Sequence, residues 1–153
     1  MLPVTFSNPP DPEIAELLRR ARTIAVVGLS ADPRRPSHRV ATALLQYGYE
    51  VVPVNPTLDT WNGRRAAPDL AAALAGLPAG RTIDIVDVFR RSEHVAGIVD
   101  DCLRLELPAL WLQQGVIDRH AAERARVAGM FVVMDRCVAV DYNRLNVAEL
   151  RAE

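Results

Sequence analysis

The sequence predicts an α/β protein in which one domain forms around a parallel sheet of five strands. Five short apolar runs, rich in β-branched residues, alternate with segments in which apolar residues recur at helical spacing. Each run is continuously apolar, as expected for parallel strands that helices cover on both faces. We therefore predict a Rossmann-like, doubly wound sheet, with the strand order 3-2-1-4-5 as the expected topology.

The predicted elements follow one another as this fold requires. A leading helix lies within residues 1–22, with Asp11 as its N-cap and Pro12 and Glu13 in its first turn. The Rossmann-like core spans residues 23–140, and residues 141–153 form a C-terminal tail. Strands are predicted at residues 24–28, 51–54, 83–88, 109–112 and 131–134. Helices are predicted between them at residues 37–47, 68–75, 92–105 and 118–128.

The turn residues agree with this arrangement. Gly48 and Gly129 follow the first and last of the predicted crossover helices, where a glycine ends a helix well. The pattern is weakest between residues 57 and 80, and residues 61–65 are predicted to form a loop. Because no linker or shift in composition divides the chain, a single domain is expected.

The composition is that of a soluble globular protein. Of the 153 residues, 50% are hydrophobic and 24% are charged, and the net charge is -1. This balance gives no indication of a nucleic-acid or membrane partner. All 18 basic residues are arginine, so the chain lacks the lysine of a Schiff base and the lysine of a phosphate-binding P-loop.

The cysteines and histidines do not suggest a metal site. Cys102 and Cys137 lie far apart in the sequence, and no histidine completes a ligand spacing with them. Cys102 is expected to be buried and inert, and free thiols suit a reducing compartment. The N-terminus lacks the features of a signal peptide, and no apolar run approaches the roughly 20 residues of a membrane span. A cytoplasmic location is therefore expected.

The strongest functional signal follows the first predicted strand. Gly28 ends an apolar run, and a capped helix start is predicted at Ser37 after a short polar loop. Such a loop presents backbone N–H groups and the positive end of a helix dipole to an anion, so a nucleotide is expected. A dinucleotide would require three glycines and a carboxylate about twenty residues further on. Gly28 stands alone and the second strand ends at Asn55, which disfavours a nicotinamide cofactor.

The predicted strand ends define the candidate site. In an open α/β sheet, ligands bind beyond the carboxyl ends of the strands, where the strand order reverses. The residues that follow the predicted strands should therefore lie along one edge of the sheet. They are Gly28, Leu29, Ser30, Asn55, Pro56, Phe89, Arg90, Gln113, Gln114, Gly115, Asp135, Arg136 and Cys137.

These strand ends resemble the small CoA-binding proteins, which are related to the CoA-binding domain at the start of the succinyl-CoA synthetase α subunit. The segments that carry the resemblance are residues 27–30, 37–40, 48–56, 84–90, 111–115 and 133–137. They run from the first predicted strand to the last. The resemblance implies the fold described above and a ligand that is coenzyme A or an acyl-CoA.

The resemblance also implies where the phosphates of CoA would bind. The pyrophosphate would lie on the turn of residues 28–30 and on the helix start near Ser37. Arg34, Arg35, Arg39 and Arg90 would pair with phosphate oxygens. The simpler alternatives are that Ser37 only caps its own helix and that the arginines are only solvated.

The remaining strand ends would contact the rest of the ligand. Asn55, followed by Pro56, would bind the adenine or the ribose, and Phe89 would contact the adenine or the pantetheine arm. Gln113 and Gly115 would lie along the pantetheine arm. An ordinary turn at Asn55 and a core position for Phe89 are the alternatives.

Cys137 is a candidate for redox chemistry. It follows Arg136 at the end of the last predicted strand, where a neighbouring arginine would favour the thiolate. If the pantetheine arm runs toward this strand, oxidation would join its thiol to the Cys137 sulfur as a mixed disulfide. The alternative is a buried structural cysteine.

The sequence indicates a binding module and assigns no catalytic residue. It displays no nucleophile accompanied by a base and an orienting group. We therefore expect a stand-alone protein that binds CoA or an acyl-CoA, with an unidentified protein partner if it has one. Two alternatives stay open, a nicotinamide-dependent oxidoreductase and an interaction subunit that has kept the fold without a ligand.

Overall fold

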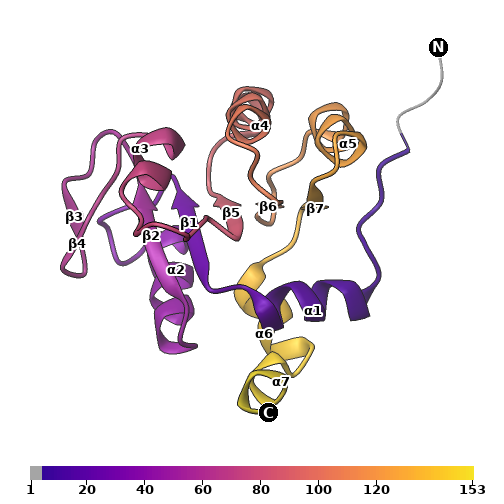
Figure 1. Cartoon of the computed structure of the whole chain (residues 1–153), viewed down its shortest axis with the longest axis horizontal. Helices are drawn as coiled ribbons and strands as arrows, with labels where there is room; N and C mark the ends of the chain where they lie inside the picture. The colour runs from indigo at the N-terminus through magenta and orange to yellow at the C-terminus, as the bar shows by residue number, and fades with distance from the viewer. Residues whose placement is uncertain (1–4) are drawn as a thin grey trace.

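The apolar runs pair into one parallel sheet, which confirms the predicted fold class. The computed structural model describes residues 5–153. Its sheet has the order β2-β1-β5-β6-β7, which can be followed in Figure 1. The strands are β1 (Thr23–Val27), β2 (Glu50–Val54), β5 (Ile85–Val88), β6 (Ala109–Leu112) and β7 (Phe131–Val133). Every residue of β1, β5 and β6 is buried, because helices cover both faces of the sheet.

The strand order differs from the predicted one. Counted along the chain, the five strands lie in the order 2-1-3-4-5, so the prediction of 3-2-1-4-5 is wrong. The third strand, β5, pairs with β1 and not with β2. On the outer edge of β2, Pro53 has no N–H group to donate to a further strand. Ala67 covers that edge instead, donating to the Pro53 carbonyl and accepting from the Asn55 N–H, both at 2.9 Å.

Seven α-helices within residues 5–153 form the two outer layers (Figure 1). One layer contains α3 (Leu70–Ala75), α4 (Val95–Arg104) and α5 (Arg119–Val127). The other contains α1 (Asp11–Arg20), α2 (Pro36–Gln46), α6 (Val138–Arg144) and α7 (Val147–Ala152). A separate apolar cluster fills the space between each layer and the sheet. Within the described residues, no helix has the length and apolar character needed to cross a membrane.

The segment predicted to be a loop after β2 forms a short hairpin. Strands β3 (Thr60–Trp61) and β4 (Arg64–Arg65) pair in antiparallel fashion. The turn residues Asn62 and Gly63 have φ angles of 49° and 75°, as an Asn-Gly hairpin turn requires. Trp61 is buried, so the hairpin is fixed to the body of the protein beside α2, where His38 meets the Trp61 ring edge-on.

Both ends of the chain differ from the prediction in detail. Pro10 is the N-cap of α1, so the assignment of Asp11 as N-cap is wrong. The Asp11 carboxylate instead accepts two hydrogen bonds from Arg144, at 2.7 and 2.9 Å. The predicted C-terminal tail is helical, because it contains the end of α6 and all of α7. These two helices pack against α1, which supplies the apolar surface that a free tail would lack.

Asp87 places a carboxyl group inside the sheet. It lies in β5, opposite Val26 of β1 and Trp111 of β6, and it is fully buried. Neither of its carboxyl oxygens has a hydrogen-bond partner among the described residues. Burial raises the pKa of Asp87 well above its usual value of 3.8, because the charged form is not solvated. The folded protein therefore retains a proton that the unfolded chain releases.

We predict that this carboxyl group makes the protein less stable as the pH rises. Above about pH 4 the unfolded chain loses the Asp87 proton and the folded protein keeps it, so the free energy of unfolding falls with pH up to the raised pKa. Asp87→Asn removes the ionisation and preserves the shape. In urea unfolding, the free energy of unfolding of the variant relative to that of the wild type should increase by up to about 1.4 kcal/mol for each pH unit in this range. If the difference in free energy of unfolding between the variant and the wild type does not change with pH, the raised pKa of Asp87 is contradicted.

Candidate functional site

The carboxyl ends of β1, β5 and β6 open onto a cleft of about 900 Å³. Four arginines line it, so we call it the arginine cleft: Arg35, Arg39, Arg90 and Arg91. It lies where the strand order reverses, between β1 and β5, which is the usual ligand position in such a sheet. The first turn of α2 forms one wall, and the start of α6 forms another.

The arginine cleft favours an anion. None of the residues that line it in the described part of the chain is acidic. Helix α2 has 11 residues, and its first turn contributes Pro36 and Ser37 to the wall of the cleft. The positive end of the α2 dipole therefore faces the cleft. Arg90 is half-buried, and its guanidinium forms no hydrogen bond or ion pair within residues 5–153. It is therefore available to a phosphate group.

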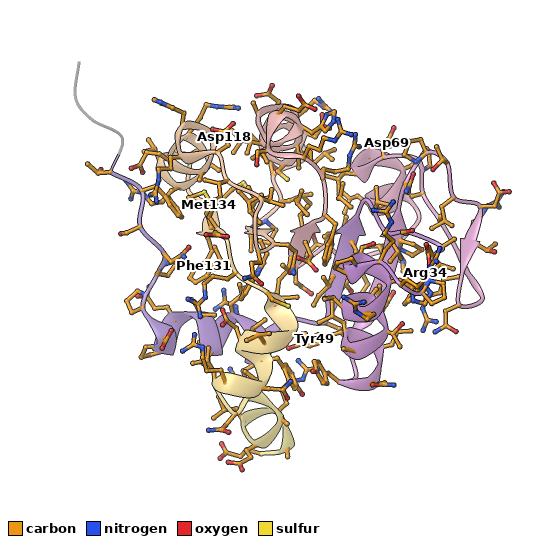
Figure 2. All side chains as sticks on the ribbon, turned by 180° about the vertical axis from the view of Figure 1, so that it is seen from behind. Arg34, Tyr49, Asp69, Asp118, Phe131 and Met134 are labelled. Carbon is orange, nitrogen blue, oxygen red and sulfur yellow. The ribbon has the colours of Figure 1, made fainter. Side chains whose placement is uncertain are left out.

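A second hollow, of about 440 Å³, adjoins the cleft. We call it the outer pocket, because it lies toward the edge strand β2. Its walls come from the residues after β2, from the start of α3 and from α4, and it shares Gly28, Phe89 and Arg90 with the arginine cleft. Unlike the cleft it contains two carboxylates, those of Asp69 and Asp101. Asp69 also caps α3 by accepting from the Ala72 N–H at 2.8 Å, and Figure 2 shows it at the start of that helix.

Gly28 joins the two hollows and brings β1 close to the end of β5. Its φ angle is +86°, and a Cβ atom built on it would lie 2.4 Å from the Phe89 carbonyl oxygen. The Gly28 N–H donates to Val54 and the Phe89 N–H donates to Val27, both at 2.8 Å, so the ladder continues past the strand ends. The glycine is therefore required by the neighbouring backbone, whether or not a ligand is bound.

Ser37 does not cap α2. The helix begins at Pro36, with Arg35 as its N-cap, so the predicted capping role is wrong. The Ser37 Oγ instead accepts from the Ser30 N–H at 3.0 Å. Ser30 in turn accepts from the Asp32 N–H through its Oγ at 3.1 Å. These bonds fix the shape of the loop, and both serines line the arginine cleft.

Asn55 supports the same loop from β2. Its Nδ2 donates to the Leu29 carbonyl at 3.0 Å, and its Oδ1 accepts from the N–H and hydroxyl of Thr57 at 2.9 and 2.8 Å. Leu29 itself is fully buried and does not line either hollow. Asn55 and Pro56 line the outer pocket, but the Asn55 amide is largely occupied by the protein.

Arg34 lies outside both hollows. Its guanidinium pairs with Asp32 through bonds of 3.1 and 3.0 Å, and its side chain is 90% exposed. This pairing lowers the pKa of the Asp32 carboxyl. In Figure 2, Arg34 lies at the side of the molecule that carries the hairpin. Arg39, which does line the cleft, donates to the Arg34 carbonyl at 2.9 Å.

The residues after β6 contribute one buried amide. Gln113 is only 4% exposed, and its Oε1 accepts from the Val138 N–H at 3.1 Å, at the start of α6. Gln113 and Gln114 line the arginine cleft, whereas Gly115 does not. Gly115, with a φ angle of +85°, donates its N–H to Asp135 at 2.8 Å and thus shapes the turn.

Cys137 lies at the cleft, but Arg136 does not act on it as predicted. Cys137 is half-buried and lines the wall at the start of α6. The Arg136 guanidinium is bound to the Asp141 carboxylate at 2.6 and 2.7 Å, so its charge is already paired. Cys102 is buried as predicted, and burial raises the pKa of its thiol to about 12.

The sequence singled out about half of the residues that line the two hollows. It did not single out Asp69, Asp101, Val116 or Val140. Val140 lies on α6, which the sequence pattern did not reveal. Asp69 is the N-cap of α3, and Asp101 lies on α4. Within residues 5–153, no group of three or more His, Cys, Asp or Glu side chains could hold a metal ion.

Comparison with known protein families shows the family of the chain. The model of a family described as "CoA binding domain" matches residues 22–143, from the residue before β1 to within α6. The chain belongs to this CoA-binding domain family. The matched region includes both hollows and excludes α1 and α7.

Relatives of this CoA-binding domain extend over nearly the whole chain. It is 42% identical over 135 residues to the uncharacterized protein YneT of Bacillus subtilis (strain 168), covering 88% of this chain and 96% of YneT. Among solved structures, Prb, a redesigned form of the PH1109 protein, matches with a TM-score of 0.83 and 30% sequence identity. The match covers 94% of this chain and 96% of the Prb chain.

A larger enzyme contains the same fold as one part. The acetyl-coenzyme A synthetase 1 of Ca. Korarchaeum cryptofilum has a TM-score of 0.64 at 27% identity, covering 78% of this chain and 27% of its own chain. The sequence-based resemblance to the CoA-binding part of CoA ligases is thus confirmed at the level of the fold.

We predict that Gly28 is required for stability by its contact with Phe89. Gly28→Ala would strain a positive φ angle and also force the new Cβ against the Phe89 carbonyl. Gly115→Ala is the matched control, because Gly115 has a similar φ angle of +85° and no atom within 4 Å of the built Cβ. In urea unfolding, Gly115→Ala should lower the free energy of unfolding by about 1–2 kcal/mol. Gly28→Ala should lower it clearly more. Equal losses would contradict this explanation.

Proposed function

We propose that this CoA-binding domain is a stand-alone module that binds coenzyme A or an acyl-CoA in the arginine cleft and the outer pocket. The observation that carries the proposal is the cleft itself. It offers four arginines, no acidic lining residue in the described chain and a helix N-terminus, all at the point between β1 and β5 where the strand order reverses. The family match supports CoA as the ligand.

The two hollows suit different parts of CoA. The pyrophosphate and 3′-phosphate are anions, which the guanidinium groups of the arginine cleft would bind. The adenine amino group and the ribose 2′-hydroxyl group would donate hydrogen bonds to the carboxylates of Asp69 and Asp101 in the outer pocket. Phe89 and Arg90 border both hollows, so the nucleotide would cross from one to the other over these residues.

This arrangement also sets the direction of the pantetheine arm. With the adenosine in the outer pocket, the arm would extend away from β2, past Gln113 and toward Cys137 and α6. The amide groups of the arm would meet Gln114. We assign no reaction to this site. Both cysteines are free, which suits a reducing, cytoplasmic compartment.

CoA should stabilise the folded protein and nicotinamide nucleotides should not. A ligand present at 100 times its dissociation constant stabilises the native state by about 2.7 kcal/mol, which is visible as a rise in Tm. We expect this rise with CoA in a thermal-shift titration. Arg90→Gln should reduce it, because the unpaired guanidinium at the junction of the hollows is lost.

Arg34→Gln is the matched control for Arg90→Gln. Arg34 is exposed, paired with Asp32 and outside both hollows, so its loss should leave the CoA-dependent rise in Tm unchanged. A response to NAD or NADP without a response to CoA would favour the oxidoreductase. No response to any nucleotide would favour an interaction subunit.

Cys137 should form a mixed disulfide with CoA. Its thiolate would attack CoA disulfide, forming a Cys137–CoA bond and releasing one CoA thiol, so that no further oxidant is needed. Intact-mass spectrometry after incubation with CoA disulfide should detect one adduct of CoA mass. The adduct should persist in Cys102→Ser, because Cys102 is buried, and disappear in Cys137→Ser. Labelling of Cys102 alone would refute the proposed direction of the arm.

A further inference from the structure

The part of the arginine cleft that faces α6 differs in character from the rest. The four arginines come from α2, from its N-cap and from the residues after β5. The opposite wall, from the residues after β6 and from α6, contains no charged lining residue within the described chain. It presents Val116, Cys137 and Val140 instead. Val140 is 59% exposed, although Val138 and Tyr142 on the same helix are buried.

Gln113 adds a fixed hydrogen-bond donor to this uncharged wall. Its Oε1 is held by the Val138 N–H at 3.1 Å, so the orientation of the amide is determined. The NH₂ group of the same amide has no hydrogen-bond partner within residues 5–153, although the side chain is only 4% exposed. Because Gln113 lines the cleft and its NH₂ nitrogen is not fully buried, this unpaired donor is accessible from the cleft and can donate to a ligand.

We infer that this wall binds the acyl group of a short aliphatic acyl-CoA, an inference that rests on the proposed binding of CoA. The thioester carbonyl oxygen accepts from the Gln113 NH₂ group. The aliphatic chain then lies against Val116 and Val140, covering the valine that α6 leaves exposed. Free CoA ends in a thiol at this point, so it neither satisfies the donor well nor covers the apolar surface.

The first experiment compares CoA with acyl-CoAs of increasing chain length. Isothermal titration with CoA, acetyl-CoA, butyryl-CoA and hexanoyl-CoA should give affinities that rise along the series. Full burial of a methylene group corresponds to about fourfold in affinity, and in this open cleft we expect roughly twofold per methylene. If CoA binds and the acyl-CoAs bind no tighter, the inference is overturned and the proposed function stands. If none of the four binds, the proposed function fails, and the inference with it.

Gln113→Glu separates the donor from the structural role of the side chain. A glutamate oxygen still accepts from the Val138 N–H, so the start of α6 is preserved, but the NH₂ donor is lost. We expect the preference for acetyl-CoA over CoA to fall by about tenfold or to disappear. An unchanged ratio of the two affinities would show that Gln113 does not contact the thioester carbonyl.

Val140→Ser tests the apolar wall. Because Val140 is exposed, the variant should fold like the wild type, which its Tm will verify. The increase in affinity from acetyl-CoA to hexanoyl-CoA should become smaller. Val127→Ser is the control, since Val127 is 71% exposed on α5 and does not line the cleft. Equal chain-length dependence in both variants would overturn the packing of the acyl chain on α6.

Discussion

At the end of β1, the backbone of Gly28 passes so close to the Phe89 carbonyl that no side chain fits between them. This contact brings the loop after β1 and the residues after β5 together at the point where the strand order reverses. Both hollows include Gly28, Phe89 and Arg90 in their walls, so their junction exists because of the same contact. A bulkier residue at position 28 would push apart the two strand ends that any ligand must bridge.

The loop after Gly28 satisfies its polar groups internally, which leaves a different set of groups for a ligand. The Ser37 hydroxyl accepts from the Ser30 N–H, and the Asn55 amide donates to the Leu29 carbonyl, so side chains of the protein itself fix the shape of the loop. The entropy cost of fixing the loop is therefore part of folding and is not added to the free energy of ligand binding. Arg90 keeps its donors free at the cleft, and this division of roles explains why a phosphate could bind without rearranging the loop.

The opposite wall is held in place by a buried carboxylate. Asp141, only 1% exposed on α6, accepts from Arg136 at 2.6 and 2.7 Å and from Arg144 at 3.2 Å. Arg144 also binds Asp11 of α1, so two segments far apart in the sequence meet at one cluster of charges. Removing Arg136 would leave the buried Asp141 carboxylate with only the 3.2 Å bond from Arg144, so the start of α6 would be held less firmly beside Gln113.

The sequence by itself determined the parallel sheet, the helices on both of its faces and the edge at which the candidate residues gather, because these follow from local apolar periodicity. Pro53 also carried a signal, since a proline suits an edge strand and disfavours the central place that the predicted order gave β2. Only the tertiary structure decided that β5 pairs with β1 and that α6 brings Val140 to the cleft. It also decided the polar partners, since Arg34 donates to Asp32 and the Thr57 N–H donates to Asn55. Strand pairing depends on contacts between residues distant in sequence. The partner that a polar side chain selects depends on which groups folding places within about 3 Å of it, and local sequence patterns do not encode that distance.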